Sequence, residues 1–297
     1  MKKAVAAFVI LIFVGILLTG IGCAVFFSKG IKEINLEYYE QFFESEEEIS
    51  SLNLDLGNAH KVVLQRGEKC SVKYFDTNVT NFTVSVENGR LNIHESGWSW
   101  KDWLKRIFYR YKSTDVVITV PENAVLDIVG DFSGATEMTL PSWEYGNIRL
   151  DVSGAAAITA SDITAKDITI EASGSTDFSI SSGKVNSLTA RASGSVKLKC
   201  DGLECPRIEV RASGSARMEL SGIGKDLVLR VSGSGRVYAK DFALETADID
   251  ASGSANAELS VSTLLKVRTS GSSNIAYWGN PEVDRYTSGS STIVKKG

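Results

Sequence analysis

The sequence has 297 residues, of which 43% are hydrophobic and 23% are charged, and its formal net charge is -4. This length suits one large or two modest folded domains, and the near-neutral charge argues against nucleic-acid binding. The chain has 26 glycines but only 4 cysteines. It is therefore too poor in cysteine for a disulfide scaffold and rich enough in small residues to suggest repeats.

The first predicted element is a transmembrane anchor over residues 1–30. Residues 4–27 carry no charged side chain, and as a helix they would extend about 36 Å, enough to span a bilayer. Lys2 and Lys3 precede this segment and an acidic linker over residues 31–48 follows it, which places the bulk of the chain outside the membrane. The alternative is a lipoprotein signal acylated at Cys23, although the residues before Cys23 match that signal poorly.

Residues 49–130 are predicted to form a β-rich section of short, irregular strands. Apolar alternation at 49–56, 82–86 and 116–120 is typical of such strands. We expect this section to cover the open first edge of the sheet that follows, because bare edges promote aggregation. His60 and His94 lie here without a cluster of other ligands at metal-binding spacing, so the sequence predicts no metal site.

An insert over residues 97–113 interrupts this section. It holds three of the five tryptophans and five basic residues against one acidic residue, and as a helix it would present one apolar stripe. Contact with a lipid interface and packing as a cap on the solenoid are equally compatible with this pattern, and an aromatic sugar-binding platform is the third alternative. The candidate contact residues are Trp98, Trp100, Trp103, Lys105, Arg106, Phe108 and Tyr111.

Nine Ser-Gly dipeptides over residues 131–297 form a regular series, at intervals of 18 to 20 residues. Apolar and polar residues alternate on both sides of each dipeptide, so the sequence predicts an all-β fold, a parallel β-helix (β-solenoid) of about nine coils. Each glycine is expected to accept unusual backbone angles at a sharp corner. These glycines are Gly134, Gly154, Gly174, Gly194, Gly214, Gly233, Gly253, Gly271 and Gly289.

Two further features of the repeats concern cysteine and the end of the array. Cys200 and Cys205 either pair across a turn or act as small core residues. Lys295 and Lys296 are expected to protect the edge of the last strand, since charged side chains discourage pairing with another chain at a free edge.

The Ser-Gly-Ser units and the C-terminal residues resemble the family of putative auto-transporter adhesin head, or head GIN domain, proteins. The likeness covers roughly residues 125–297, whereas residues 49–125 resemble the adhesin-like β-strand-repeat family of bacterial envelope proteins. The resemblance implies a bacterial surface protein with a β-helical fold and no established enzymatic activity. The residues that carry it most clearly are Tyr277-Trp278-Gly279-Asn280-Pro281-Glu282-Val283 and Thr287-Ser288-Gly289-Ser290-Ser291.

The sequence contains no motif for a serine nucleophile, a phosphate-binding loop or a dinucleotide site, and we expect no cofactor. Some parallel β-helices act on polysaccharides through carboxylates grouped with basic residues. Asp248 and Asp250 share one outward face, and Glu171, Glu209 and Arg211 occupy comparable positions on neighbouring coils. A solvated charged face is the simpler interpretation of these five residues.

Together these features predict a non-enzymatic, single-pass protein of the cell membrane with the bulk of the chain extracytoplasmic. Its expected partners are membrane lipid, through the N-terminal helix, and a cell-wall polymer or an envelope protein, through the solenoid; no nucleic acid is expected. The alternatives are a polysaccharide-acting β-helix enzyme and an accessory protein of envelope-stress signalling.

Overall fold

The computed structural model describes residues 36–78, 80–96 and 113–296, and these residues contain β-strands but no helix. The strands are β1 (Tyr38–Ser45), β2 (Ser51–Leu56), β3 (Ala59–Gly67), β4 (Cys70–Thr77), β5 (Asn81–Glu87), β6 (Arg90–Ser96), β7 (Thr114–Pro121), β8 (Leu126–Phe132), β9 (Ala135–Leu140), β10 (Glu144–Val152), β11 (Ala155–Ala172), β12 (Ser175–Ala192), β13 (Ser195–Glu204), β14 (Arg207–Ala212), β15 (Ser215–Ile223), β16 (Asp226–Val231), β17 (Ser234–Ala251), β18 (Ser254–Gly271), β19 (Asn274–Trp278), β20 (Glu282–Gly289) and β21 (Thr292–Lys295).

Within these ranges no helix is long and apolar enough to cross a membrane. The anchor predicted at residues 1–30 lies outside the described residues. So do residues 97–112 of the aromatic and basic insert, including all seven of its candidate contact residues.

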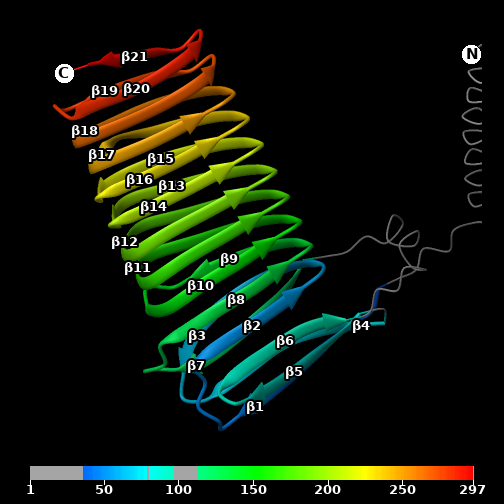
Figure 1. Cartoon of the computed structure of the whole chain (residues 1–297). Helices are drawn as coiled ribbons and strands as arrows, with labels where there is room; N and C mark the ends of the chain where they lie inside the picture. Colours follow the sequence, from blue (N-terminus) through cyan, green and yellow to red (C-terminus); the bar gives the residue numbers. More distant parts are fainter. Residues whose placement is uncertain (1–35, 79, 97–112, 297) are drawn as a thin grey trace, which may run out of the picture. The chain divides into compact units, whose positions relative to one another are not determined.

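Strands β8 to β21 wind into a parallel β-solenoid (Figure 1). Ala155 pairs with Ser175, twenty residues later, and Asn256 pairs with Asn274, eighteen residues later. The hydrogen-bonded register thus reproduces the spacing of the Ser-Gly dipeptides and confirms the predicted all-β solenoid. Nine corner glycines enclose eight turns, so the chain makes eight turns between Gly134 and Gly289 where about nine coils were predicted.

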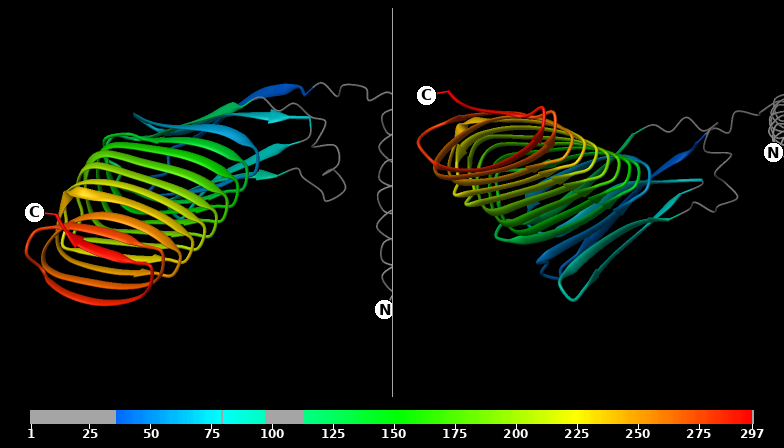
Figure 2. Two further views of the ribbon diagram at one scale, coloured as in Figure 1. Left: turned by 90° about the horizontal axis from the view of Figure 1, so that it is seen from above. Right: turned by 45° about the horizontal axis from the view of Figure 1, so that its top comes forward.

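The interior is built from columns of equivalent apolar side chains. On β12, Leu188, Ala190 and Ala192 are buried, while Arg191 between them points outward. Leu188 is in register with Ile168 on the turn before it and with Ile208 on the turn after it. Each turn therefore buries its apolar side chains against its two neighbours, and Figure 2 shows the turns stacked closely one on another.

The corner glycines are required for a reason other than the predicted one. A Cβ on Gly194 would lie 2.0 Å from the carbonyl oxygen of Gly174, and a Cβ on Gly174 would lie 1.8 Å from that of Gly154. Apart from Gly289, with φ of +85°, these glycines have no left-handed φ. The corner therefore excludes a side chain because successive turns approach too closely there, and only secondarily because of backbone angle.

Left-handed backbone occurs instead at the second, polar corner of the solenoid. Asp162 has φ of 50° and Ser182 has φ of 59°. The next two turns place glycines nearby, Gly202 with φ of 64° and Gly222 with φ of 129°. Aspartate, serine and glycine are residue types common in turns, so this corner tolerates side chains that the first one cannot hold.

The N-terminal strands extend the solenoid backwards and then close it. β2 pairs in parallel with β8, and β3 pairs in parallel with β9. Regular stacking therefore starts before the predicted boundary at residue 131. Beyond this first turn β6 adds to β2 and β7 adds to β3, and the antiparallel strands β5, β4 and β1 form the outermost layer (Figure 1).

The last turn, β20 and β21, carries polar side chains at inward positions. Arg285 pairs with Val267, which is fully buried, and Thr287 pairs with Thr269, which is 3% exposed. Arg285 and Thr287 themselves are exposed. The columns that end at Arg285 and Thr287 therefore become polar on the last turn, while Val283 and Ile293 of the same turn still pack against the core.

The described cysteines are free and buried. Cys200 and Cys205 form no disulfide, so of the two predicted alternatives they act as small core residues. Burial raises the pKa of the Cys205 thiol to about 11, and burial raises the pKa of the Cys200 thiol further. Both thiols are therefore protonated near neutral pH and unreactive.

Candidate interaction surface

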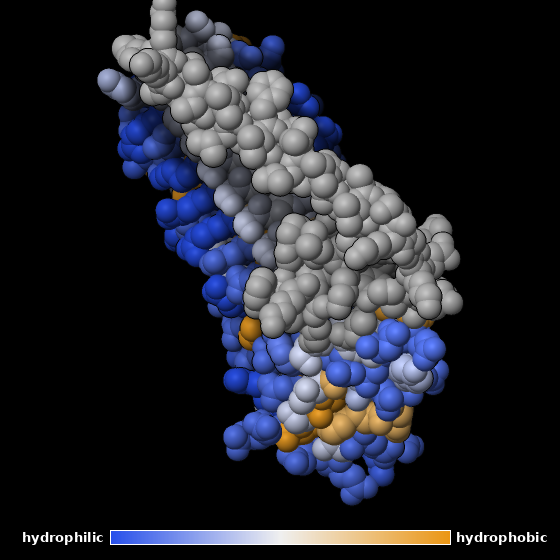
Figure 3. All heavy atoms as spheres, turned by 90° about the vertical axis from the view of Figure 1, so that its right-hand side faces the viewer, coloured by the Kyte–Doolittle hydropathy of each residue, from blue (hydrophilic) through white to orange (hydrophobic). Residues whose placement is uncertain are grey.

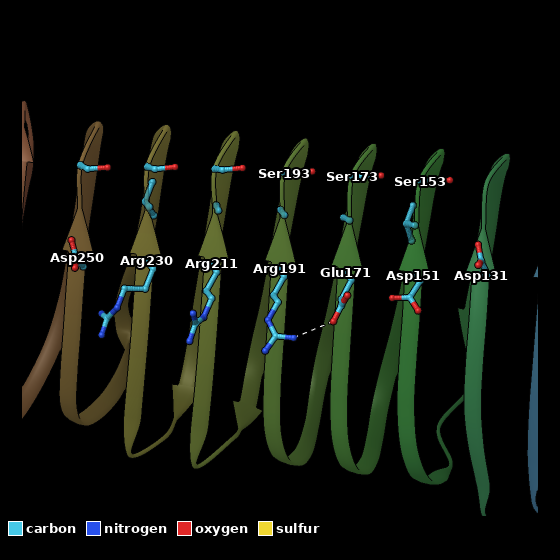
Figure 4. Close-up of a pocket in the computed structure, with 18 residues that line it drawn as sticks. Asp131, Asp151, Ser153, Glu171, Ser173, Arg191, Ser193, Arg211, Arg230 and Asp250 are labelled. Carbon is cyan, nitrogen blue, oxygen red and sulfur yellow. Dashed lines mark hydrogen bonds and ion pairs between the residues drawn. The ribbon is translucent and has the colours of Figure 1, made fainter.

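A shallow groove of about 860 Å³ crosses successive turns of the solenoid just before the Ser-Gly corner. Residues two apart on a strand point to the same side, so each turn contributes one charged side chain to the groove, and every turn but that of Asp131 also contributes a corner serine (Figure 4). We name the charged set the corner row. It consists of Asp131, Asp151, Glu171, Arg191, Arg211, Arg230 and Asp250.

Two residues earlier on each strand lies a second outward set on the same face, which we name the middle row. Arg149 pairs with Thr169, Thr189 with Glu209, and the parallel register aligns the other members. The middle row consists of Val129, Arg149, Thr169, Thr189, Glu209, Val228 and Asp248.

Charge is ordered along the corner row. Three consecutive turns carry Asp131, Asp151 and Glu171, and the next three carry Arg191, Arg211 and Arg230 (Figure 4). Parallel strands lie about 4.8 Å apart, so like charges adjoin within each block. The first six turns of the groove therefore have an acidic half and a basic half, and the seventh adds a carboxylate, Asp250, after the basic half.

Ion pairs link the arginines to carboxylates on the same face. Arg191 Nη1 lies 3.1 Å from Glu171 Oε1, and Arg230 Nη2 lies 2.8 Å from Asp248 Oδ2. Arg211 bonds to Glu209 through Nε at 2.7 Å, while its two terminal nitrogens have no acceptor among the described residues. A guanidinium carries five N–H groups, so these arginines keep donors for a partner.

The carboxyl groups differ in pKa along the face. Partial burial raises the pKa of Asp131, and the neighbouring carboxylates of Asp55 and Asp151 raise it further. The hydrogen bond from Arg230 lowers the pKa of Asp248, and that from Arg211 lowers the pKa of Glu209. Within the acidic half Asp151 and Glu171 pair with Arg149, at 3.2 Å and 3.5 Å, so the raised pKa distinguishes Asp131 from its neighbours.

The structure brings the five residues of the enzyme hypothesis onto one face, but not in a form suited to glycoside cleavage. Glu171 pairs with Arg191, Glu209 with Arg207 and Arg211, and Asp248 with Arg230. A general acid needs a raised pKa, yet the pKa values of Asp248 and Glu209 are lowered. The arrangement favours a charged recognition surface.

The sheet on the other side of the Ser-Gly corner has a different chemistry. The Arg217 guanidinium lies 5.3 Å from the ring centre of Tyr238, which is 40% exposed, beside a hollow of about 440 Å³. On the turns beyond it, Lys240 Nζ lies 4.9 Å from the ring of Trp278. We name this surface the post-corner face.

The two histidines, for which no metal site was predicted, each face a single carboxylate. His60 Nε2 lies 2.9 Å from Glu95 Oε2, and both side chains are almost fully buried. Glu95 also accepts hydrogen bonds from the amides of Gly57 and Asn58. Burial raises the pKa of Glu95, but these bonds and the His60 charge outweigh it, so the net pKa is lowered. In the described ranges no group of three or more potential ligands is placed to hold a metal.

Polar residues cover the visible side of the solenoid, while an apolar patch lies at its N-terminal end (Figure 3). The exposed large apolar residues of β1, an edge strand, are Phe42, which is 65% exposed, and Tyr39. Three members of the corner row, Glu171, Arg211 and Asp250, were placed on one outward face from the sequence, but the complete row was not recognised. Its signal was present, because each member stands two residues before the serine of a Ser-Gly dipeptide.

Comparisons with known proteins agree with this architecture. A family model described as "Putative auto-transporter adhesin, head GIN domain" matches residues 52–218 and 191–281. It includes most of the section for which the sequence indicated a separate likeness. No functionally curated protein matches the chain.

Two solved structures show the same fold at low sequence identity. One is a putative lipid binding protein from Parabacteroides distasonis, 18% identical with a TM-score of 0.55, and the match covers 89% of this chain and 98% of that one. The other is a putative adhesin from Parabacteroides merdae, 12% identical with a TM-score of 0.51, covering 89% and 97%.

Proposed function

The chain belongs to the putative auto-transporter adhesin, head GIN domain, family, and from this premise we propose that it is a membrane-anchored, extracytoplasmic interaction module of the bacterial envelope. The observation that carries the proposal is the groove, which presents an ordered row of charges on rigid strands across seven turns. In this proposal the uncharged segment at residues 4–27 is the anchor and the solenoid is the part that meets a partner.

The shape of the groove favours a macromolecular partner over a small molecule. Small-molecule sites are concave and mostly apolar, whereas this groove is shallow and lined by charged, serine and small side chains. Complementary charges on a rigid surface give protein partners register and specificity. A protein surface with the opposite order of charges is therefore the partner that we propose.

Site-specific photo-crosslinking in intact cells tests this function. A photoreactive residue at Ser193, in the groove, should yield a covalent adduct with an envelope macromolecule. The matched control at Ser179, on the post-corner face, should yield none. Adducts from Ser179 alone, or none from either position, would contradict the assignment of the groove. Recovery of the chain in the cytosolic fraction would contradict the anchor.

A second candidate function, binding of a cell-wall polymer, is favoured by the post-corner face. Tyr238 and Trp278 each present a ring beside a cation, and aromatic rings provide rigid, amphipathic contact area. Retention on isolated cell walls should fall when Tyr238 is replaced by Ala. The control is Tyr286→Ala, since Tyr286 is 72% exposed but lies on the last turn. Equal retention of both variants and the parent chain would remove this candidate.

A further inference from the structure

The order of charges in the corner row is complementary to itself when it is reversed. Its first six members read acid, acid, acid, base, base, base in chain order (Figure 4). We propose that the partner of the groove is a second copy of this chain, packed face to face and antiparallel. This inference rests on the function proposed above and names the partner of the same groove.

The symmetry of such a pair fixes which residues meet. A two-fold axis that lies in the interface and runs parallel to the strands keeps each row opposite the same row of the second copy, with the order of turns reversed. Placing the axis between the turns of Glu171 and Arg191 sets Glu171 opposite Arg191 of the second copy. The same axis sets Asp151 opposite Arg211, and Asp131 opposite Arg230. The symmetry doubles these contacts to six ion pairs.

The middle row matches about the same axis, which is an independent observation. Arg149 comes opposite Glu209 of the second copy, and Thr169 comes opposite Thr189. Val129, which is 43% exposed, comes opposite the half-buried Val228. Charge meets opposite charge and an exposed apolar side chain meets another, without any further adjustment of register.

Other registers lose this complementarity. Moving the axis onto the turn of Arg191 brings Arg191 against its own copy, and moving it onto the turn of Glu171 brings two Glu171 carboxylates together. In a parallel pair, a two-fold axis along the middle row places each middle-row charge opposite its own copy, Arg149 against Arg149 and Glu209 against Glu209. Like charges in contact are strongly unfavourable in an interface, so the face is selective for one antiparallel register.

Two outward positions oppose the pairing. In the corner row Asp55, which is in register with Asp131 on the turn before it, would come opposite Asp250 of the second copy. The row farthest from the corner would bring Asp127 opposite Asp226 of the second copy. Both carboxylates already accept hydrogen bonds within the chain, Asp127 from the Asn147 amide at 2.6 Å and Asp226 from Thr246 at 2.6 Å. This contact lies at the edge of the face, where solvent screens it.

The area of the proposed dimer interface can be estimated from its dimensions. Six turns span roughly 24 Å between their outermost strands, and three outward residues span roughly 14 Å along each strand. Two such faces, each about 340 Å² in outline, bury roughly 700 Å² in total, less than the roughly 1,000 Å² expected of a specific interface. We therefore expect a weak dimer that salt dissociates, because its contacts are mainly ionic.

Charge reversal and mixing of variants test the proposal on the full chain in detergent. The first variant carries D131R, D151R and E171R, and the second carries R191E, R211E and R230E. Each alone places like charges opposite each other, so sedimentation equilibrium should show a Kd raised by more than ~100-fold over the parent dimer. An equimolar mixture should recover a dimer that contains one copy of each variant.

The matched control reverses three charges on the post-corner face, Asp177→Arg, Lys197→Glu and Arg217→Glu, and should leave the parent Kd unchanged. Circular dichroism checks that each variant folds. If a triple variant does not fold, the single-substitution variants D151R and R211E are measured alone and mixed in the same way. A parent chain that stays monomeric at low salt, or a mixture that stays monomeric, overturns self-association. Groove crosslinks to another macromolecule in cells, with a monomeric purified chain, would overturn it while leaving the proposed interaction function intact.

Discussion

The eight regular turns and the N-terminal strands differ in how their strands pair and in how their side chains are buried. In the turns, every strand pairs with an equivalent about twenty residues away, and the columns of apolar side chains have no natural end. At the N-terminus, antiparallel strands close the stack, and His60 and Glu95 form a buried hydrogen bond there. The regular turns thus repeat one pattern of strand pairing, whereas the N-terminal end contains antiparallel strands and a buried polar cluster around Glu95.

This difference predicts that the two regions fail for different physical reasons. A turn is sensitive to added volume, because its corners leave no space between successive backbones. The closing region is sensitive to lost charge, because Glu95 accepts bonds from Gly57, Asn58 and His60 in a site without solvent. Substitutions that add volume at a corner, and substitutions that remove the charge of Glu95, therefore test the two regions separately.

The largest effect is expected for Gly194→Ala in the regular turns. The new Cβ would lie 2.0 Å from the carbonyl oxygen of Gly174, a backbone atom that cannot move without disturbing its turn. We expect a loss of roughly 4 kcal/mol in the free energy of unfolding. Urea denaturation followed by circular dichroism measures it.

The control for this substitution is Gly202→Ala at the second corner. A Cβ there meets nothing closer than 3.9 Å, but φ is +64°. The cost should be only the left-handed backbone penalty of about 1 kcal/mol. A larger loss at Gly202 than at Gly194 would show that backbone angle, not close approach, selects glycine.

The next effect is expected for Glu95→Gln in the closing region. Replacing the buried carboxylate disrupts the hydrogen bonds that it makes with Gly57, Asn58 and His60, which should cost about 3 kcal/mol, and the loss should be seen at neutral pH by thermal or urea unfolding. Glu204→Gln is the control, since Glu204 pairs with Lys184 at 2.9 Å in solvent. Equal losses for the two variants would show that the burial of Glu95 does not matter.

The same carboxyl predicts a pH dependence. The folded-state pKa of Glu95 lies below its ordinary value, so the folded protein binds fewer protons than the unfolded chain at mildly acidic pH. The stabilisation is full above the ordinary glutamate pKa of about 4.3 and is lost as pH falls through the folded-state pKa. Glu95→Gln should unfold with a weaker dependence on acid than the parent, and identical acid profiles would contradict this.

A smaller effect of opposite sign is expected for Thr176→Val in the regular turns. The Thr176 hydroxyl is buried and has no hydrogen-bond partner among the described residues, and the next turn carries Val196 at the same position. Removing an unsatisfied hydroxyl should stabilise the protein by about 1 kcal/mol. Thr246→Val, which removes a hydroxyl that donates to Asp226, should destabilise it instead.

The smallest effect is expected for Lys197→Ala. The Lys197 ammonium lies 3.2 Å from Asp177, and about half of each side chain is exposed. Exposed pairs contribute little, so the change in unfolding free energy should be below about 0.5 kcal/mol. A loss as large as that of Glu95→Gln would mean that surface charge, rather than the buried pair, supports the fold.

The solenoid could be predicted from the sequence because its signals are local. The spacing of the serines and the alternation around Ala190 set the register and the interior without knowledge of distant contacts. The reason for glycine at the corner was predicted wrongly, since the atom that excludes a Cβ on Gly194 belongs to Gly174, one turn away. Only the stacked structure shows how closely those backbones approach.

The N-terminal arrangement and the groove were harder to predict for related reasons. Leu52 pairs with Ile128, and His60 meets Glu95, contacts that no local pattern indicates. The charges of the corner row were visible two residues before each serine. Their order acquires meaning only when the turns are placed side by side, so that Glu171 adjoins Arg191.

Each regular turn adds a set length to the solenoid, and the last turn exposes Arg285 and Thr287, polar groups that discourage pairing at a free strand edge. Adding one twenty-residue unit in the middle would lengthen it by about 4.8 Å and leave both tips unchanged. Evolution can thus adjust how far the molecule reaches by changing the number of units alone.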